Sequence, residues 1–146
     1  MAAAPSQTFA NHGRYVPLYH FALGAILAAN LVFTIVHVAR HPTLYQAWIG
    51  LAMAVGFLII FWYARDFAKT VQDRVIRLEE TLRMERLLPP DLKSRIGELT
   101  VRQLVGLRFA SDAELVTLVR RALDERLDQR SIKQSVQHWR PDHLRA

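Results

Sequence analysis

Two long apolar stretches without charged residues dominate the first half of the chain. Residues 15–39 and residues 41–64 contain no Asp, Glu, Lys or Arg. A helix needs about 20 mostly apolar residues to cross roughly 30 Å of hydrocarbon. The pattern predicts transmembrane helices over residues 16–39 and 43–64, joined by a tight turn into an antiparallel hairpin. The alternative is a buried hairpin in a soluble protein, but the rest of the chain has too little apolar surface to cover it.

The first apolar stretch is expected to be an uncleaved anchor and not a signal peptide. Its apolar run is longer than the about 7–15 residues of a signal-peptide core. Small residues recur at helical spacing in both stretches, and such spacing lets two helix backbones approach closely in lipid. The expected helix-packing residues are Gly24, Ala28, Gly50, Ala54 and Gly56.

Three polar residues share one face of the first predicted span. Asn30, Thr34 and His37 lie at i, i+4 and i+7. Polar side chains inside a membrane usually meet another polar group, so we expect hydrogen bonds across helices or to a partner. Ligation of a haem or chlorophyll by His20 or His37 is an alternative that the sequence leaves open. No bound cofactor is expected.

The charges are distributed very unevenly, and this determines the expected orientation. Residues 1–63 carry only Arg14 and Arg40, whereas all 13 Asp and Glu residues follow the second span. Cytoplasmic flanks of membrane helices carry an excess of Lys and Arg. Both termini, including residues 1–15, are therefore expected in the cytoplasm. Three basic residues after the second span are expected to contact anionic lipid headgroups; they are Arg65, Lys69 and Arg74.

The second span is expected to continue into the cytoplasm as one long helix. Neither proline nor glycine interrupts residues 57–88. Apolar residues recur there at alternating spacings of three and four, an amphipathic stripe over residues 65–88. The stripe consists of Ala68, Val71, Val75, Leu78 and Leu82. It is expected either to pair with another chain as a short coiled coil or to pack on the chain's own later helices. Glu79 and Arg83 are expected to pair at i, i+4.

Residues 89–146 are predicted to form a small cytoplasmic bundle of short helices. Asp91 is expected to cap a helix that Gly97 ends, and capping boxes begin at Thr100 and Ser111. A last helix is predicted over residues 130–139. One helix face is expected to be buried, and it consists of Leu115, Leu118, Val119, Ala122 and Leu123. The predicted fold class is thus an all-α membrane protein with a hairpin, a long extended helix and a bundle.

No motif for catalysis is evident in the sequence. There is no cysteine, and we find no phosphate-binding loop, metal-binding helix pair or nucleophile motif. The carboxylates alternate with arginines, which is typical of a solvated helix face. No metal site is expected, because His138, Asp142 and His143 lack a fourth ligand. Nucleic-acid binding through a last helix is disfavoured, because the carboxylates dilute its basic charge; the residues concerned are Lys133, Gln134, Gln137 and Arg140.

Several local runs resemble a family of small, uncharacterised bacterial membrane proteins with two spans. They are VPLYH (16–20), VQDRVIRLEE (71–80), ERLLP (85–89), RIGELT (95–100), LRFASD (107–112) and WRPD (139–142). The resemblance implies a bacterial inner-membrane location and supplies no activity, because the family is a domain of unknown function.

From the residues, we expect a non-enzymatic, membrane-anchored interaction protein. Its expected role is an accessory or structural subunit of a larger inner-membrane complex for respiration, photosynthesis or transport. Expected partners are membrane lipids and other membrane subunits, with a second copy of the chain as an alternative. The alternative function is a membrane-tethered regulator that binds nucleic acid or a soluble protein through its basic C-terminal helices.

Overall fold

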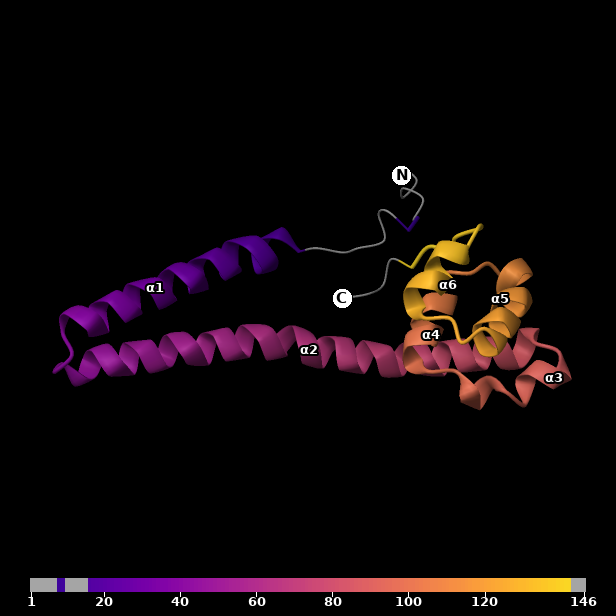
Figure 1. The fold of residues 1–146 in the computed structure, drawn as a ribbon, viewed down its shortest axis with the longest axis horizontal. Coiled ribbons are helices and arrows are strands. Elements are labelled where there is room, and N and C mark those ends of the chain that lie inside the picture. Colours follow the sequence, from indigo (N-terminus) through magenta and orange to yellow (C-terminus); the bar gives the residue numbers. More distant parts are fainter. Residues whose placement is uncertain (1–7, 10–15, 143–146) are drawn as a thin grey trace. The chain divides into compact units, whose positions relative to one another are not determined.

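The computed structural model describes residues 8–9 and 16–142, and all of the regular elements in this part are helical. The predicted all-α class is confirmed. In chain order the elements are η1 (Leu18–Leu23), α1 (Gly24–Arg40), α2 (Tyr45–Leu87), α3 (Pro90–Lys93), η2 (Ile96–Glu98), α4 (Val101–Leu107), α5 (Asp112–Asp124) and α6 (Gln129–Ser135) (Figure 1). They fall into two compact units that divide between Ala68 and Lys69. We call residues 16–68 the hairpin unit and residues 69–142 the helical unit.

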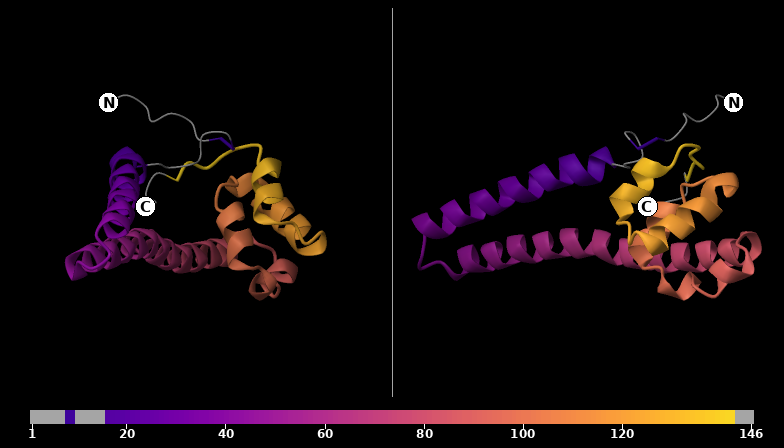
Figure 2. Two further views of the ribbon diagram at one scale, coloured as in Figure 1. Left: turned by 60° about the vertical axis from the view of Figure 1, so that its left-hand side comes forward. Right: turned by 45° about the vertical axis from the view of Figure 1, so that its right-hand side comes forward.

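Two helices run antiparallel in the hairpin unit, as the apolar stretches predicted (Figure 2). The first begins with a π-helical turn, η1, which hydrophobic periodicity did not reveal, and continues as α1 to Arg40. The second begins at Tyr45, two residues later than predicted. Of the predicted segment of residues 1–15, the structure describes only residues 8 and 9.

The helices of the hairpin meet along a seam of buried residues spaced seven apart on each helix. Leu27 and Thr34 of α1 are buried, as are Ala47 and Ala54 of α2. The α2 positions of the seam carry small side chains. The seam occupies one face of each helix, so the other faces of the hairpin unit remain exposed.

The predicted continuation of the second helix is confirmed. α2 is one helix of 43 residues that ends at Leu87. Pro89 disfavours helical geometry at the preceding residue and therefore stops the helix. The same helix thus carries the second apolar stretch and the first element of the helical unit.

The core of the helical unit is built on one face of the last turns of α2. Met84 and Leu88 are buried there against leucines from the later helices. The predicted buried face of α5 is confirmed, with Leu115, Leu118, Val119 and Ala122 buried and Leu123 partly buried. A helix as short as α5 is only marginally stable alone, so tertiary packing of its buried face supplies most of its stability.

The caps of the short helices follow the predictions in part. Thr100 and Gln103 form the expected capping box of α4, and Asp128 accepts a hydrogen bond from the Ser131 N–H at 2.7 Å to begin α6. Asp91, however, does not cap a helix, because Pro90 occupies the first helical position and needs no N–H partner there.

Two predicted helix ends were also wrong. The helix after Pro89 stops at Lys93, and Gly97 lies within η2. The last helix ends at Ser135, four residues before Trp139. The residues after it are extended because they pair with the chain between α4 and α5, a contact that no local pattern encodes.

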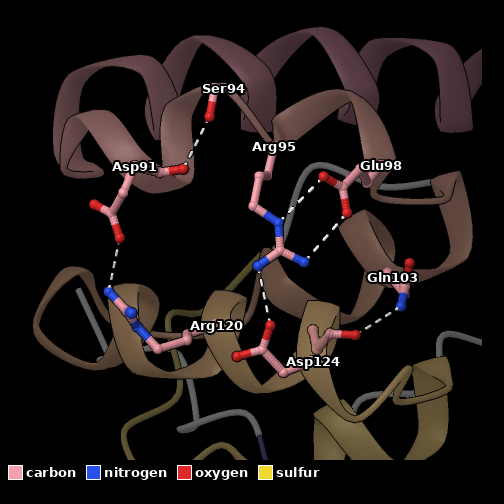
Figure 3. Close-up of polar contacts among 8 residues, drawn as sticks. Asp91, Ser94, Arg95, Glu98, Gln103, Arg120 and Asp124 are labelled. Carbon is pink, nitrogen blue, oxygen red and sulfur yellow. Dashed lines mark hydrogen bonds and ion pairs between the residues drawn. The ribbon is translucent and has the colours of Figure 1, made fainter.

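Exposed ion pairs join the segment after α2 to α5 (Figure 3). Arg95 contacts Asp124 at 2.9 Å, and Arg120 contacts Asp91 at 3.1 Å. Exposed pairs of this kind contribute about 0–1 kcal/mol each. They help to align the two segments, while the apolar core beneath provides most of the stability.

Gly106 allows the closest approach between α4 and α6, and we predict that Gly106→Ala is destabilising. An added Cβ would lie 3.0 Å from Ile132 Cγ2 and 3.2 Å from the Gln129 backbone oxygen. Overpacking of this kind costs about 1–3 kcal/mol. The free energy of unfolding of the helical unit, measured by amide hydrogen exchange, tests this. Gly97→Ala is the matched control, because nothing lies within 4 Å of its added Cβ; an equal effect of both changes would contradict the prediction.

Candidate functional site

Three of the five predicted helix-packing residues lie in the contact between α1 and α2. Ala54 is fully buried. A Cβ on Gly24 would lie 3.8 Å from Phe61 Cζ, and a Cβ on Gly50 would lie 3.8 Å from Thr34 Cγ2. Ala28 is exposed, and nothing lies within 4 Å of a Cβ at Gly56. Each of these two positions is offset by one or two residues from the seam, which turns it about 100–200° away around a helix of 3.6 residues per turn.

The predicted polar face of α1 is divided between two environments. Thr34 is buried in the seam, and its hydroxyl donates to the backbone oxygens of Asn30 and Leu31 at 3.0 and 2.9 Å. The side chain of Asn30 is exposed, and His37 is half-buried with its ring stacked on Phe33. Thr34 is therefore satisfied within its own helix, whereas Asn30 presents an amide on the apolar outside of the hairpin unit.

The π-helical turn η1 is fastened to α2 by Tyr19. Its hydroxyl donates to the Phe61 backbone oxygen, and its ring stacks on the Phe61 ring with centroids 4.7 Å apart. His20 lies beside this contact, with Nδ1 3.0 Å from the Val16 backbone oxygen. The geometry thus assigns Tyr19 a packing role that the sequence analysis did not identify.

The amphipathic stripe on α2 is exposed along its whole length. Val71, Val75, Leu78 and Leu82 are 62, 48, 62 and 56% exposed, and Ala68 is exposed as well. The opposite face of α2 carries the buried Ile76, Glu80, Arg83 and Met84. The expectation that the stripe packs on the chain's own later helices is therefore wrong, because these helices cover the other side of α2.

A buried arginine connects α2 to the start of α5. Arg83 donates to the Asp112 carboxylate at 2.8 and 2.6 Å, to Glu80 at 3.1 Å and to the Ala110 backbone oxygen at 2.7 Å. Arg83 and Glu80 are 5 and 4% exposed. The expected solvated pair of Glu79 with Arg83 is not formed. The bundle covers the side of α2 that carries Arg83. Glu80, one residue after Glu79, lies on this covered side.

The pKa values of the two carboxyl groups beside Arg83 are shifted in opposite directions. Burial raises the pKa of Glu80 above its ordinary value of 4.5, and Arg83 opposes this only in part. The hydrogen bonds from Arg83 hold the pKa of Asp112 below its ordinary value of 3.8. Asp112 is largely solvated, whereas burial disfavours the charged form of Glu80.

The segment after α6 is held against the chain between α4 and α5. Ala110 and Trp139 form an antiparallel bridge, and the Trp139 ring contacts Phe109 with centroids 4.9 Å apart. The Glu114 carboxylate accepts from the backbone N–H of Ser111, Gln137 and His138 at 3.0–3.2 Å. Trp139 thus packs the segment after α6 against Phe109.

A cavity of about 770 Å³ lies between α2 and this segment, lined by Arg83, Arg86, Ser111, Asp112 and His138 among others. A serine, a histidine and an aspartate in one cavity invite comparison with a nucleophilic triad, which requires hydrogen bonds from serine to histidine and from histidine to carboxylate. Among the described residues neither bond is present, and Asp112 is held by Arg83 instead. The side-chain contact seen among these residues is the ion pair of Arg83 with Asp112.

Some basic residues of the helical unit form ion pairs with carboxylates. Arg140 lies 3.6 Å from Glu80, and Arg108 lies 3.2 Å from Asp142. The Lys133 ammonium lies over the Phe109 ring. Asp142 is thus drawn toward Arg108 and not toward His138, and His143 lies outside the described residues. The candidate headgroup contacts Lys69 and Arg74 are exposed, and Arg65 is half-buried.

Sequence reasoning missed Arg83, Glu80 and Arg108 as buried charges. Their charge and their alternation with other charged residues favoured a solvated face. A signal existed in the apolar residues at Ile76, Met84 and Leu88, which are spaced eight and four apart and mark a second helix face through Glu80.

Comparison with known proteins gives a family and no activity. A family model described as a family of unknown function (DUF6526) matches residues 1–146, the whole chain. No curated protein and no solved structure matches the chain.

Proposed function

Since the chain belongs to a family of unknown function, no activity comes with its membership, and we propose that it is a non-enzymatic subunit anchored in the bacterial inner membrane. The hairpin unit is the anchor, and the helical unit binds or aligns partners on the cytoplasmic side. The observation that carries this proposal is the exposed apolar surface of the hairpin unit.

The apolar surface of the hairpin unit is far larger than a protein in water tolerates. Two helices among the described residues are long and apolar enough to cross a membrane, and only 11% of the residues in either apolar window are buried. Exposing apolar surface to water costs about 25 cal/mol per Å². Lipid around the hairpin unit removes this cost. The seam between α1 and α2 covers only one face of each helix.

A cytoplasmic location of the helical unit is supported by the flanking charge. Arg65, Lys69 and Arg74 follow the second apolar stretch, whereas the turn between α1 and α2 offers only Arg40. Positive charge near the ends of spans favours the cytoplasmic side. We therefore place both termini in the cytoplasm.

An association with other membrane subunits is supported by Asn30. Its side chain is exposed on α1 within the apolar stretch. An amide facing lipid lacks hydrogen-bond partners, so polar residues in spans are usually covered by another helix. A neighbouring subunit that supplies a donor or acceptor at this level satisfies the requirement.

The membrane anchor predicts a response to a charge on the outside of α1. Val32 is 62% exposed, and an arginine at the centre of a span costs about 2.5–3.5 kcal/mol. We expect Val32→Arg to reduce the share of the chain that stays in the membrane pellet after alkaline carbonate extraction. Ala113→Arg, at an exposed position of α5, is the control and should leave that share unchanged. Recovery of the unaltered chain in the high-speed supernatant without detergent would overturn the anchor.

The subunit role is tested by purification in mild detergent and mass spectrometry of the proteins that co-purify. Stoichiometric membrane proteins, lost on Asn30→Leu, would support it. A chain recovered with nucleic acid or a soluble protein would overturn it in favour of a membrane-tethered regulator.

A further inference from the structure

The α2 stripe is an apolar face that the described helices of the helical unit leave open. It is the side of α2 opposite the buried Ile76 and Met84. We propose that a second copy of this chain docks on this face and forms a short, parallel, two-stranded coiled coil over residues 68–82. The proposal deepens the proposed function and rests on it, because the membrane anchor sets the relative orientation of the two copies.

The spacing of the stripe fits a two-stranded coiled coil. With Ala68, Val75 and Leu82 at position a of the heptad, Val71 and Leu78 occupy position d. A β-branched residue at a followed by leucine at d favours two strands, and Val75 with Leu78 supplies this pair at the centre. The next d position is Glu85, whose charge ends the apolar seam.

The residues beside the seam are complementary in charge for a parallel pair. Arg74 occupies position g and Glu79 the following position e, and both side chains are exposed. In a parallel coiled coil, g of one strand faces e of the next heptad on the other. Arg74 of each copy therefore faces Glu79 of its partner, and two-fold symmetry forms the pair twice. An antiparallel pair brings g toward g and loses this match.

The membrane explains how so short a seam suffices. About two heptads are too few for stable association in water. Two copies anchored in one bilayer share an orientation, and each α2 leaves the apolar stretch at the same residue, so register is set in advance. Confinement also raises the effective concentration of the second strand.

Single cysteines in the full-length chain test the proposal directly, since the sequence contains no cysteine of its own. In native membrane vesicles under mild oxidation, Val71→Cys and Leu82→Cys are each expected to form a disulfide-linked species at twice the 16.8 kDa chain mass. Arg77→Cys is the control, because position 77 is exposed but lies at heptad position c. We expect roughly tenfold more linked dimer at the seam positions than at position 77, because only seam residues face each other.

Charge exchange tests the flanking pairs. Arg74→Glu in the Leu82→Cys chain should reduce the linked dimer severalfold, and Glu79→Arg in addition should restore it. Helix content by circular dichroism should be the same in all of these variants, because every altered side chain is exposed.

The outcomes separate this proposal from the membrane anchor. A chain that pellets with membranes but links no better at positions 71 and 82 than at 77 overturns the dimer and leaves the anchor standing. If a disulfide forms only when Val71→Cys and Leu82→Cys chains are mixed, the parallel arrangement is overturned. If the linked species contains a different protein, the proposal that the partner is a second copy of this chain is overturned. A soluble chain that links as expected overturns the anchor and, with it, the role given to the membrane in setting orientation and register.

Discussion

Arg83→Met is expected to lower the free energy of unfolding of the helical unit by about 3–5 kcal/mol, because it removes the hydrogen-bonded counter-charge of a buried carboxylate and leaves it only the longer contact with Arg140 at 3.6 Å. Glu80 is 4% exposed and takes a 3.1 Å hydrogen bond from Arg83. The change also removes the bonds to Asp112 and Ala110, which fix the start of α5 against α2. Amide hydrogen exchange of α4–α6 in the full-length protein measures the loss in the helical unit separately from the hairpin unit.

The double variant Glu80→Leu/Arg83→Met is the control that separates charge from packing. Replacing both members of a buried pair by apolar groups is often nearly neutral, so it should be less destabilised than Arg83→Met alone. If both variants lose equally, the buried charge of Glu80 is not the cause.

The loss in Arg83→Met should also depend on pH in a defined direction. Without Arg83, the folded-state pKa of Glu80 lies still further above its ordinary value of 4.5. The stability that accompanies protonated Glu80 is present below the unfolded pKa and is lost as pH rises through the folded pKa. The deficit should therefore shrink as pH falls toward 4.5, and a deficit that grows on acidification would contradict this assignment.

Phe109→Ala is expected to destabilise the helical unit by a similar amount, about 3–5 kcal/mol, through the cavity it leaves. Phe109 is fully buried, and its ring contacts Trp139 with centroids 4.9 Å apart. Its loss should release the segment after α6 first, so residues 136–140 should exchange amide hydrogens faster than α5. The same exchange experiment measures both effects.

Phe67→Ala is the matched control, since it removes the same ring from an α2 position that is 64% exposed. It should leave exchange in α4–α6 unchanged. Equal effects of the two changes would show that the loss is not due to the Phe109 cavity.

These effects bear on function because the helical unit determines which face of α2 is available. Arg83, Glu80 and Met84 fasten the bundle to one side and thereby leave the stripe on the other side exposed. A loosened bundle would expose a second apolar face of α2, and specific pairing through residues 68–82 would then compete with non-specific contacts.

The sequence by itself determined which segments are helical and where many of these helices begin or end. Two apolar stretches of 25 and 24 residues, an uninterrupted run up to Pro89 and polar caps at Thr100 and Asp128 are local features. Helix periodicity, capping and proline geometry act over a few residues, so they can be recognised without knowing the fold.

The tertiary structure alone decided which sides of these helices are covered. α2 has two faces with apolar residues. The bundle packs on the face with Ile76 and Met84 and leaves the more regular stripe exposed. It also turned Arg83 and Glu80 inward, placed Ala28 and Gly56 outside the hairpin seam, and drew residues after Ser135 out of a helix. Each outcome depends on groups far apart in the sequence, such as Arg83 with Asp112 or Phe109 with Trp139, whose burial energy appears only once they meet.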